Sequence, residues 1–185
     1  MTENIKDRIP NRVECEELMA RYSMLPNIVE HSLQVMHVSL AITDNLKDGV
    51  AVNRDLVIAA ALLHDITKTR SLKTKEKHAA SGGALLRELG FPSIAEIVEQ
   101  HVIIQNLHLE GKIEEKEIVY YADKRVMHDT IVSIEERVQD LIRRYGTSEE
   151  IHNQIIRNKQ QVLAVEQKIT DCMKIDIHRA IQDIV

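Results

Sequence analysis

The sequence predicts an all-α protein, a bundle of about eight helices. Aromatic residues make up only 3% of the 185 residues, with no Trp and one Phe, so the core must consist of Leu, Ile, Val, Ala and Met. That composition suits packed helices better than a β-sandwich or a barrel. Six Gly and three Pro leave few tight turns. Because the length is typical of one domain, we expect residues 1–185 to form a single domain.

Capping residues and apolar periodicity divide the first half of the chain. Asn11 and Asn53 stand where N-cap residues would open helices. The stretch 56–63, LVIAAALL, is apolar on every side, which predicts a buried helix. The charged stretch 67–77 is expected to be a solvated loop. The expected helices span residues 11–22, 27–46, 54–66 and 78–89.

In the second half, Ser93, Ser133 and Thr147 are each followed three residues later by Glu, which predicts three capping boxes. Residues 105–116 are expected to form a polar loop. The expected helices span residues 93–101, 117–127, 134–145 and 148–185, the last with a break at 158–159. Gly82 and Gly83 lie inside an expected helix, where each costs about 1 kcal/mol relative to Ala. Close approach of a neighbouring helix explains them best.

Composition excludes several classes of function. The net charge is −5, and no stretch combines clustered Lys or Arg with aromatic residues, so a nucleic-acid polymer is not the expected partner. No apolar run approaches the roughly 20 residues that span a membrane, and the start of the chain lacks the apolar core of a signal peptide. Cys15 and Cys172 form no Cys-x-x-Cys motif. We expect a cytoplasmic protein with reduced thiols.

The pair His64–Asp65 ends the apolar stretch and is the strongest chemical signal. A carboxylate at the end of a buried helix must pair with a cation or coordinate a metal, because an unpaired buried charge costs several kcal/mol. A second pair, His128–Asp129, has neither a long apolar helix before it nor a Lys three residues after its Asp. We interpret the second pair as a surface or capping feature.

Imidazole and carboxylate side chains recur at or near the ends of apolar helices. They are His31, His64, Asp65, His78, His101 and Asp123. Imidazole and carboxylate without thiolate suit Mn, Fe, Co, Ni or Zn. A site of this kind with open positions fits hydrolysis by a metal-activated water.

At these residues the sequence resembles the HD-domain metal-dependent phosphohydrolases, whose signature is H…HD…D. The match consists of His31 in EHSLQV, His64–Asp65 in LLHDITK and Asp123 in YYADKRV, and it covers roughly residues 27–138. The resemblance implies an HD-domain helical bundle in which His31, His64, Asp65 and Asp123 bind a first metal ion. Residues 148–185 would be a C-terminal helical extension.

The resemblance also implies a second ion. The stretch KHAASGGALLRELGFPSIAEIVEQHV resembles the segment that supplies two further His ligands in some branches, which would be His78 and His101, with Asp65 bridging both ions. This is similar to the HDIG-like, dinuclear sub-branch, which includes diadenosine-polyphosphate hydrolases and HD-GYP cyclic-dinucleotide phosphodiesterases. The GYP segment is absent here, and Val102 stands where those phosphodiesterases have a second adjacent His.

Lys68 resembles the family's HD-x-x-K position, where it would hold a substrate phosphate. The alternative interpretation is that Lys68 is an exposed Lys near a helix C-terminus, a position that favours cations. Asp65 and Lys68 are therefore the expected catalytic residues, and Arg70 and Arg125 are weaker candidates for phosphate contacts.

The expected activity is hydrolysis of a phosphoester or phosphoanhydride in a nucleotide-type substrate. It would use two divalent ions, Fe or Mn, with Co, Ni or Zn as other possibilities. The alternatives are a mononuclear 5′-nucleotidase-like phosphomonoesterase and a non-catalytic regulatory module that binds a metal or nucleotide. The amphipathic residues 148–185 would either pack on the bundle or form a homodimer contact.

Overall fold

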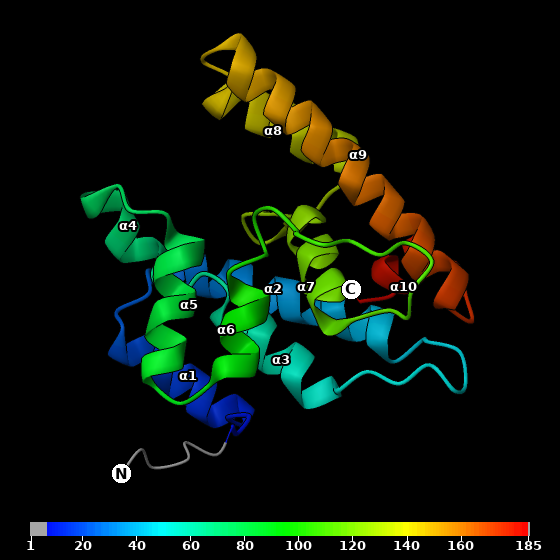
Figure 1. Cartoon of the computed structure of the whole chain (residues 1–185), viewed down its shortest axis with the longest axis horizontal. Helices are drawn as coiled ribbons and strands as arrows, with labels where there is room; N and C mark the ends of the chain where they lie inside the picture. The colour runs from blue at the N-terminus through cyan, green and yellow to red at the C-terminus, as the bar shows by residue number, and fades with distance from the viewer. Residues whose placement is uncertain (1–6, 185) are drawn as a thin grey trace.

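The computed structural model describes residues 7–184 and confirms the all-α prediction (Figure 1). Within that range it contains ten helices and one two-stranded hairpin. The elements in chain order are α1 (Arg12–Arg21), α2 (Pro26–Thr43), α3 (Arg54–Leu63), α4 (Lys68–Thr74), α5 (His78–Glu88), α6 (Pro92–Val98), α7 (Glu115–Lys124), β1 (Val126–Met127), β2 (Thr130–Ile131), α8 (Ile134–Tyr145), α9 (Glu149–Cys172) and α10 (Ile177–Gln182).

Helix α3 is the buried centre of the bundle. It packs against α1, α2, α6 and α7, and its residues from Ala59 to Leu63 are completely buried, as the apolar stretch predicted. Asn53 caps it, since its Oδ1 accepts a hydrogen bond from the Leu56 amide at 3.2 Å. Figure 1 shows α5 and α6 on one side and the α8–α9 pair on the other, with α2, α3 and α7 between them. The C-terminal end of α3 therefore points into the core of the bundle.

The two adjacent glycines of α5 let α6 approach closely. A Cβ on Gly82 would lie 3.1 Å from Cγ1 of Val98, and one on Gly83 would overlap the Glu99 side chain. The expectation of close helix–helix contact is thus confirmed, and it fixes the relation between the start of α5 and the end of α6.

Helix α9 packs against α8 and α7. Its Lys168 Nζ lies 2.7 and 2.9 Å from the two carboxylate oxygens of Glu117 on α7, and donates to the His108 carbonyl at 2.8 Å. Both side chains are buried. This ion pair links α9 to α7, the helix that carries Asp123.

Several sequence expectations about element ends were wrong. Residues 67–77 contain α4 rather than only a loop, because charged residues are compatible with an exposed short helix. Ser93 does not cap α6; Phe91 precedes the helix with Pro92 at its first turn, and Ser93 Oγ donates to Asp7. The expected 117–127 helix stops at Lys124, and its last residues form β1.

The C-terminal segment also differs. Ser148, not Thr147, caps α9, and no break occurs at 158–159. Asn158 lies within the helix and accepts a hydrogen bond from the Tyr120 hydroxyl at 2.5 Å. The helix ends at Cys172 instead, where Lys174 donates its amide to the Asn45 carbonyl at 2.8 Å. The Ser133 capping box at the start of α8 is confirmed.

None of the helices in residues 7–184 combines the length and hydropathy needed to cross a membrane.

Candidate metal centre

The structure brings all six residues proposed as ligands from the sequence into one cluster. They come from five places: the second turn of α2, the two residues after α3, the start of α5, the segment after α6, and α7. Two overlapping groups have ligand atoms within 4.8 Å of one another: His31, His64 and Asp65, and then Asp65, His78 and His101. Asp65 belongs to both groups.

The carboxylates lie between imidazoles. Asp123 Oδ1 is 3.0 Å from His31 Nε2 and 3.7 Å from His64 Nε2. Asp65 Oδ1 is 3.2 Å from His78 Nε2 and 3.5 Å from His101 Nε2, and Asp65 Oδ2 is 3.6 Å from His64 Nε2. Asp123 thus faces two imidazole nitrogens and Asp65 faces three, an arrangement that suits coordination of a cation.

Backbone carbonyls orient three of the four imidazoles. Nδ1 of His31, His64 and His101 lies 2.8, 2.7 and 2.6 Å from the carbonyls of His128, Ala61 and Val98, respectively. A carbonyl only accepts, so Nδ1 carries the proton and, in the neutral ring, Nε2 presents its lone pair to the cluster. Metal-binding imidazoles are commonly oriented in this way.

The acceptors of His64 and His101 have a local origin. In each case the carbonyl lies three residues earlier, in the last turn of α3 or α6. Carbonyls in a last helical turn lack partners within the helix, and here the imidazole provides one. The position of each His just past its helix therefore sets its tautomer.

Burial and neighbouring charges set the protonation of four of the clustered residues to the form that binds metal, namely His64, His78, Asp65 and Asp123. Burial lowers the pKa of His64 to about 4 and that of His78 to about 3, so both are neutral at pH 7. Burial alone would raise the pKa of Asp65 and Asp123, but the neighbouring cationic and imidazole groups hold both well below the usual range. For His31 burial lowers the pKa, but the hydrogen bond to Asp123 together with the charges of Asp123 and Asp65 outweighs burial and raises the pKa.

Two buried atoms of the cluster lack hydrogen-bond partners, which tests whether these residues fit a cation. They are His64 Nε2 and Asp65 Oδ1. In addition, Nε2 of His78 and Nε2 of His101 lie 3.2 Å apart, so two imidazole nitrogens converge beside Asp65. Buried polar atoms without a hydrogen-bond partner are costly unless a cation or another group satisfies them. Neutral imidazoles with ionised carboxylates are the forms that bind divalent transition metals, so the residues fit such ions.

Lys124 is a site residue that the sequence reasoning missed. Its buried Nζ donates to Asp123 Oδ2 and to the His101 carbonyl, both at 2.7 Å, and lies 4.9 Å from the Tyr120 ring centroid. Burial lowers its pKa, although Asp123 opposes the shift. The available signal was a cation inside the mostly apolar stretch EIVYYADKRVM. Lys124 joins two of the ligand-bearing segments.

Lys68 lies at the edge of the cluster. Its Nζ is 3.5 Å from Asp65 Oδ2 and 3.4 Å from His78 Nε2, and its side chain is 34% exposed. A cation here can reach both the ligands and solvent. Because it begins α4, it is not a lysine at the C-terminal end of a helix.

The two arginine candidates have other partners. Arg125 is buried; its Nε donates to the Val132 carbonyl at 2.8 Å and its Nη1 to the Tyr121 hydroxyl at 2.7 Å. Arg70 is exposed and pairs with Glu76 at 2.5 Å. Neither arginine faces the cluster through these contacts: Arg125 is bonded to Val132 and Tyr121, and Arg70 to Glu76.

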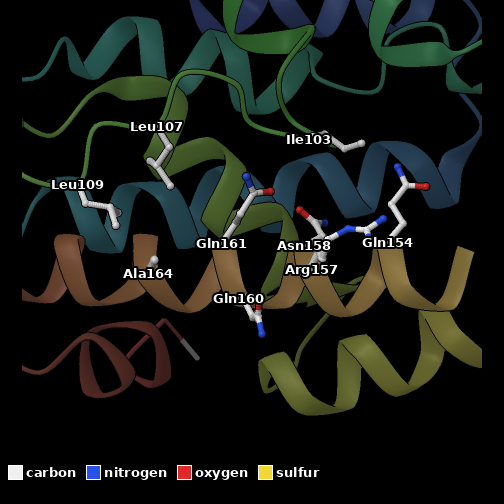
Figure 2. A pocket seen from close by; sticks show the side chains of 9 residues that line it. All are labelled: Ile103, Leu107, Leu109, Gln154, Arg157, Asn158, Gln160, Gln161 and Ala164. Atoms are coloured by element: carbon white, nitrogen blue, oxygen red, sulfur yellow. The ribbon is translucent and has the colours of Figure 1, made fainter. Parts of the chain in front are cut away.

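A groove of about 570 Å³ lies between α9 and the loop after His101 (Figure 2). Leu107 and Leu109 line the loop side, while Asn158 and Gln161 extend from α9 toward the loop. The lining includes none of the six clustered His and Asp residues, so the groove is distinct from the candidate metal centre.

The fold and the site define a class: an all-α bundle whose buried His and Asp side chains can hold metal ions. Comparison with known protein families then identifies the particular family within this class. Residues 28–128, more than half of the chain, match the model of the HD domain. The chain therefore belongs to the HD-domain phosphohydrolase superfamily.

Three curated relatives are distant. An uncharacterized protein of Methanocaldococcus jannaschii is 28% identical over 65% of this chain and 78% of its own length. The dihydroneopterin 2′,3′-cyclic phosphate phosphodiesterase of the same organism is 34% identical over 52% of this chain and 45% of its own length. A tRNA (cytidine(56)-2′-O)-methyltransferase of Picrophilus torridus is 30% identical over 69% of this chain and 40% of its own length. The chain spans less than half of the latter two, and no solved structure matches it.

Proposed function

We propose that this protein is a dinuclear metal-dependent phosphohydrolase that cleaves a phosphoester or phosphoanhydride bond in a nucleotide-type substrate. The observation that carries the proposal is the double membership of Asp65, whose carboxylate lies in both groups of ligand atoms. A carboxylate shared in this way is what a two-ion site requires. Fe or Mn are the ions proposed, with Co, Ni or Zn also suited to the donors.

Each residue has a distinct proposed role. His31, His64 and Asp123, with Asp65, would hold the first ion, and His78 and His101, with Asp65, would hold the second. When bound, the ions supply a water nucleophile at neutral pH and bind the phosphoryl oxygens. Lys68, partly exposed beside Asp65, would hold a substrate phosphate as a point charge. Lys124 would keep Asp123 ionised and fixed through its 2.7 Å contact.

A phosphodiester is the first substrate class to screen. The support is the relative whose name states a cyclic phosphate phosphodiesterase, although that likeness covers only 52% of this chain. Cyclic 2′,3′-nucleotides, linear diesters and dinucleoside polyphosphates would be compared with nucleoside monophosphates, which a mononuclear phosphomonoesterase would prefer.

We also propose that the chain is one HD domain, with a core at about residues 27–138 and an extension at 148–185. The buried Lys168–Glu117 pair between α9 and α7 supports packing of the extension on the core.

The test combines metal content with two matched variants. Protein purified anaerobically without chelator should contain close to two equivalents of Fe or Mn by elemental analysis. Asp65→Asn should lose both metal and turnover while keeping its helical circular dichroism spectrum. The control is Asp129→Asn in the second His–Asp pair, where the side chain is exposed and turnover should be unchanged. Full activity in Asp65→Asn would refute the proposal, and a single equivalent would favour the mononuclear alternative.

A further inference from the structure

The second His–Asp pair forms the turn of the β1–β2 hairpin. Val126 pairs with Ile131 and Met127 with Thr130, which leaves His128 and Asp129 as the two connecting residues. His128 has a φ of +59°. Two-residue hairpin turns require a positive φ at their first central residue, and among non-glycine residues Asn, Asp and His adopt it most readily.

This turn directs a backbone oxygen at the candidate metal centre. The His128 carbonyl accepts a hydrogen bond from Nδ1 of His31 at 2.8 Å, although 97 residues separate the two in the chain. The other two oriented imidazoles, His64 and His101, use carbonyls of the helix end beside them. The orientation of His31 therefore depends on the shape of a distant turn.

The imidazole of His128 makes a separate contact, with a residue of α8. It is exposed, and its Nε2 accepts a hydrogen bond from Arg144 Nη2 on α8 at 2.8 Å. The side chain thus contacts α8, while the carbonyl contacts His31. The two contacts can be separated by substitution.

We propose that His128 is a positioning residue for the metal centre. The left-handed backbone of His128 aims its carbonyl at Nδ1 of His31, fixes the proton there and keeps Nε2 of His31 directed at Asp123 and the rest of the cluster, where it would bind the first ion. The inference rests on the proposed metal site. The role belongs to the backbone, and the His128 side chain matters because it tolerates a positive φ.

Three substitutions separate backbone from side chain. His128→Gly and His128→Asn accept a positive φ but remove the imidazole, whereas His128→Val is β-branched and resists that conformation. In titrations with Co²⁺ monitored by absorption, Gly and Asn variants should bind within about threefold of the parent protein. The Val variant should bind about 10- to 100-fold more weakly, the range typical of lost outer-shell contacts.

Ser23→Val is the matched control. Ser23 is exposed, has a φ of +54° and lies between α1 and α2, and its amide donates to the Ala20 carbonyl. Its substitution therefore imposes the same backbone conflict without altering the contact between His128 and His31. Thermal unfolding should show comparable destabilisation in both Val variants, but only His128→Val should lose Co²⁺ affinity. Equal losses of affinity in both would overturn the inference in favour of general strain.

A second readout does not need the metal. In the chelated protein, ¹⁵N NMR should show a protonated Nδ1 on His31, assigned by its absence in His31→Gln. This signal should persist in His128→Gly and disappear or shift in His128→Val. Loss of affinity in His128→Gly equal to that in His128→Val would assign the effect to the imidazole and refute a backbone role. If the parent protein binds no Co²⁺, the proposed metal function fails, and the NMR comparison still decides whether the turn positions His31.

Discussion

Removal of the Lys168 charge should destabilise the protein strongly. Lys168 is buried on α9 and contacts both carboxylate oxygens of Glu117 on α7. In Lys168→Met the aliphatic stem is kept, but Glu117 loses the cation that balances its charge. Its capping contact with the Glu114 amide, at 2.9 Å, remains.

The magnitude follows from the separation of the two charges and from the known cost of breaking a buried pair. At the observed 2.7 Å and an effective dielectric constant of about 20, the attraction between them is about 6 kcal/mol. Removing one partner of a buried ion pair typically costs less than this full attraction, about 3–5 kcal/mol. We therefore expect Lys168→Met to lose about 3–4 kcal/mol of unfolding free energy.

The assay is urea unfolding followed by far-UV circular dichroism, with chelator present so that metal binding does not contribute. The double variant Glu117→Gln with Lys168→Met should recover most of the loss, because no buried charge remains unpaired.

Lys159→Met is the control on the same helix. Lys159 pairs with the exposed Glu135, so its loss should cost less than about 1 kcal/mol. A cost for Lys168→Met no larger than that of the control, or a double variant as unstable as the sum of its single variants, would show that the buried pair does not hold α9 to α7.

Three further outcomes are expected. Burial raises the pKa of the Cys15 thiol to about 12, so below that pH it stays protonated; at pH 8 a thiol reagent should titrate the partly exposed Cys172 alone, and two thiols only after denaturation. Asn53→Ala should cost about 1 kcal/mol of unfolding free energy by removing the Leu56 cap contact, whereas Asn53→Asp should be tolerated. Mn²⁺ at about 100 times its Kd should stabilise the chelated protein by about 2.7 kcal/mol for each ion bound in thermal unfolding, and the Asp65→Asn variant should show no such response.

The clustering of the six His and Asp residues could be predicted because each stands where an apolar helical pattern begins or ends. The end of α3 is the clearest case, since an apolar stretch that stops at His64–Asp65 can only deliver them to the core. Lys124 was not predicted because a lysine at the end of α7 is equally compatible with an exposed helix edge. Its burial depends on Tyr120 and the His101 carbonyl, which come from tertiary packing.

The fold class followed from composition, but several element ends did not. The polar pair 158–159 suggested a break that does not occur, because Asn158 contacts Tyr120 across the α7–α9 interface. Helix α9 ends instead at Cys172, where the chain pairs with the segment after α2. The Lys174 amide donates to the Asn45 carbonyl, and the Lys47 amide donates to the Cys172 carbonyl, both at 2.8 Å. Partners more than 120 residues apart leave no trace in local periodicity.

The use of main-chain oxygens to orient His31, His64 and His101 has a consequence for how this centre tolerates sequence change. Since every residue has a carbonyl, replacing Ala61 or Val98 with another side chain that fits the core leaves the acceptor in place. Inserting or deleting one residue between acceptor and imidazole would instead rotate the imidazole away, because it changes the three-residue spacing. Around His64 and His101 the centre should therefore be robust to point substitution and sensitive to changes in segment length, a vulnerability that residue-by-residue comparison of side chains does not reveal.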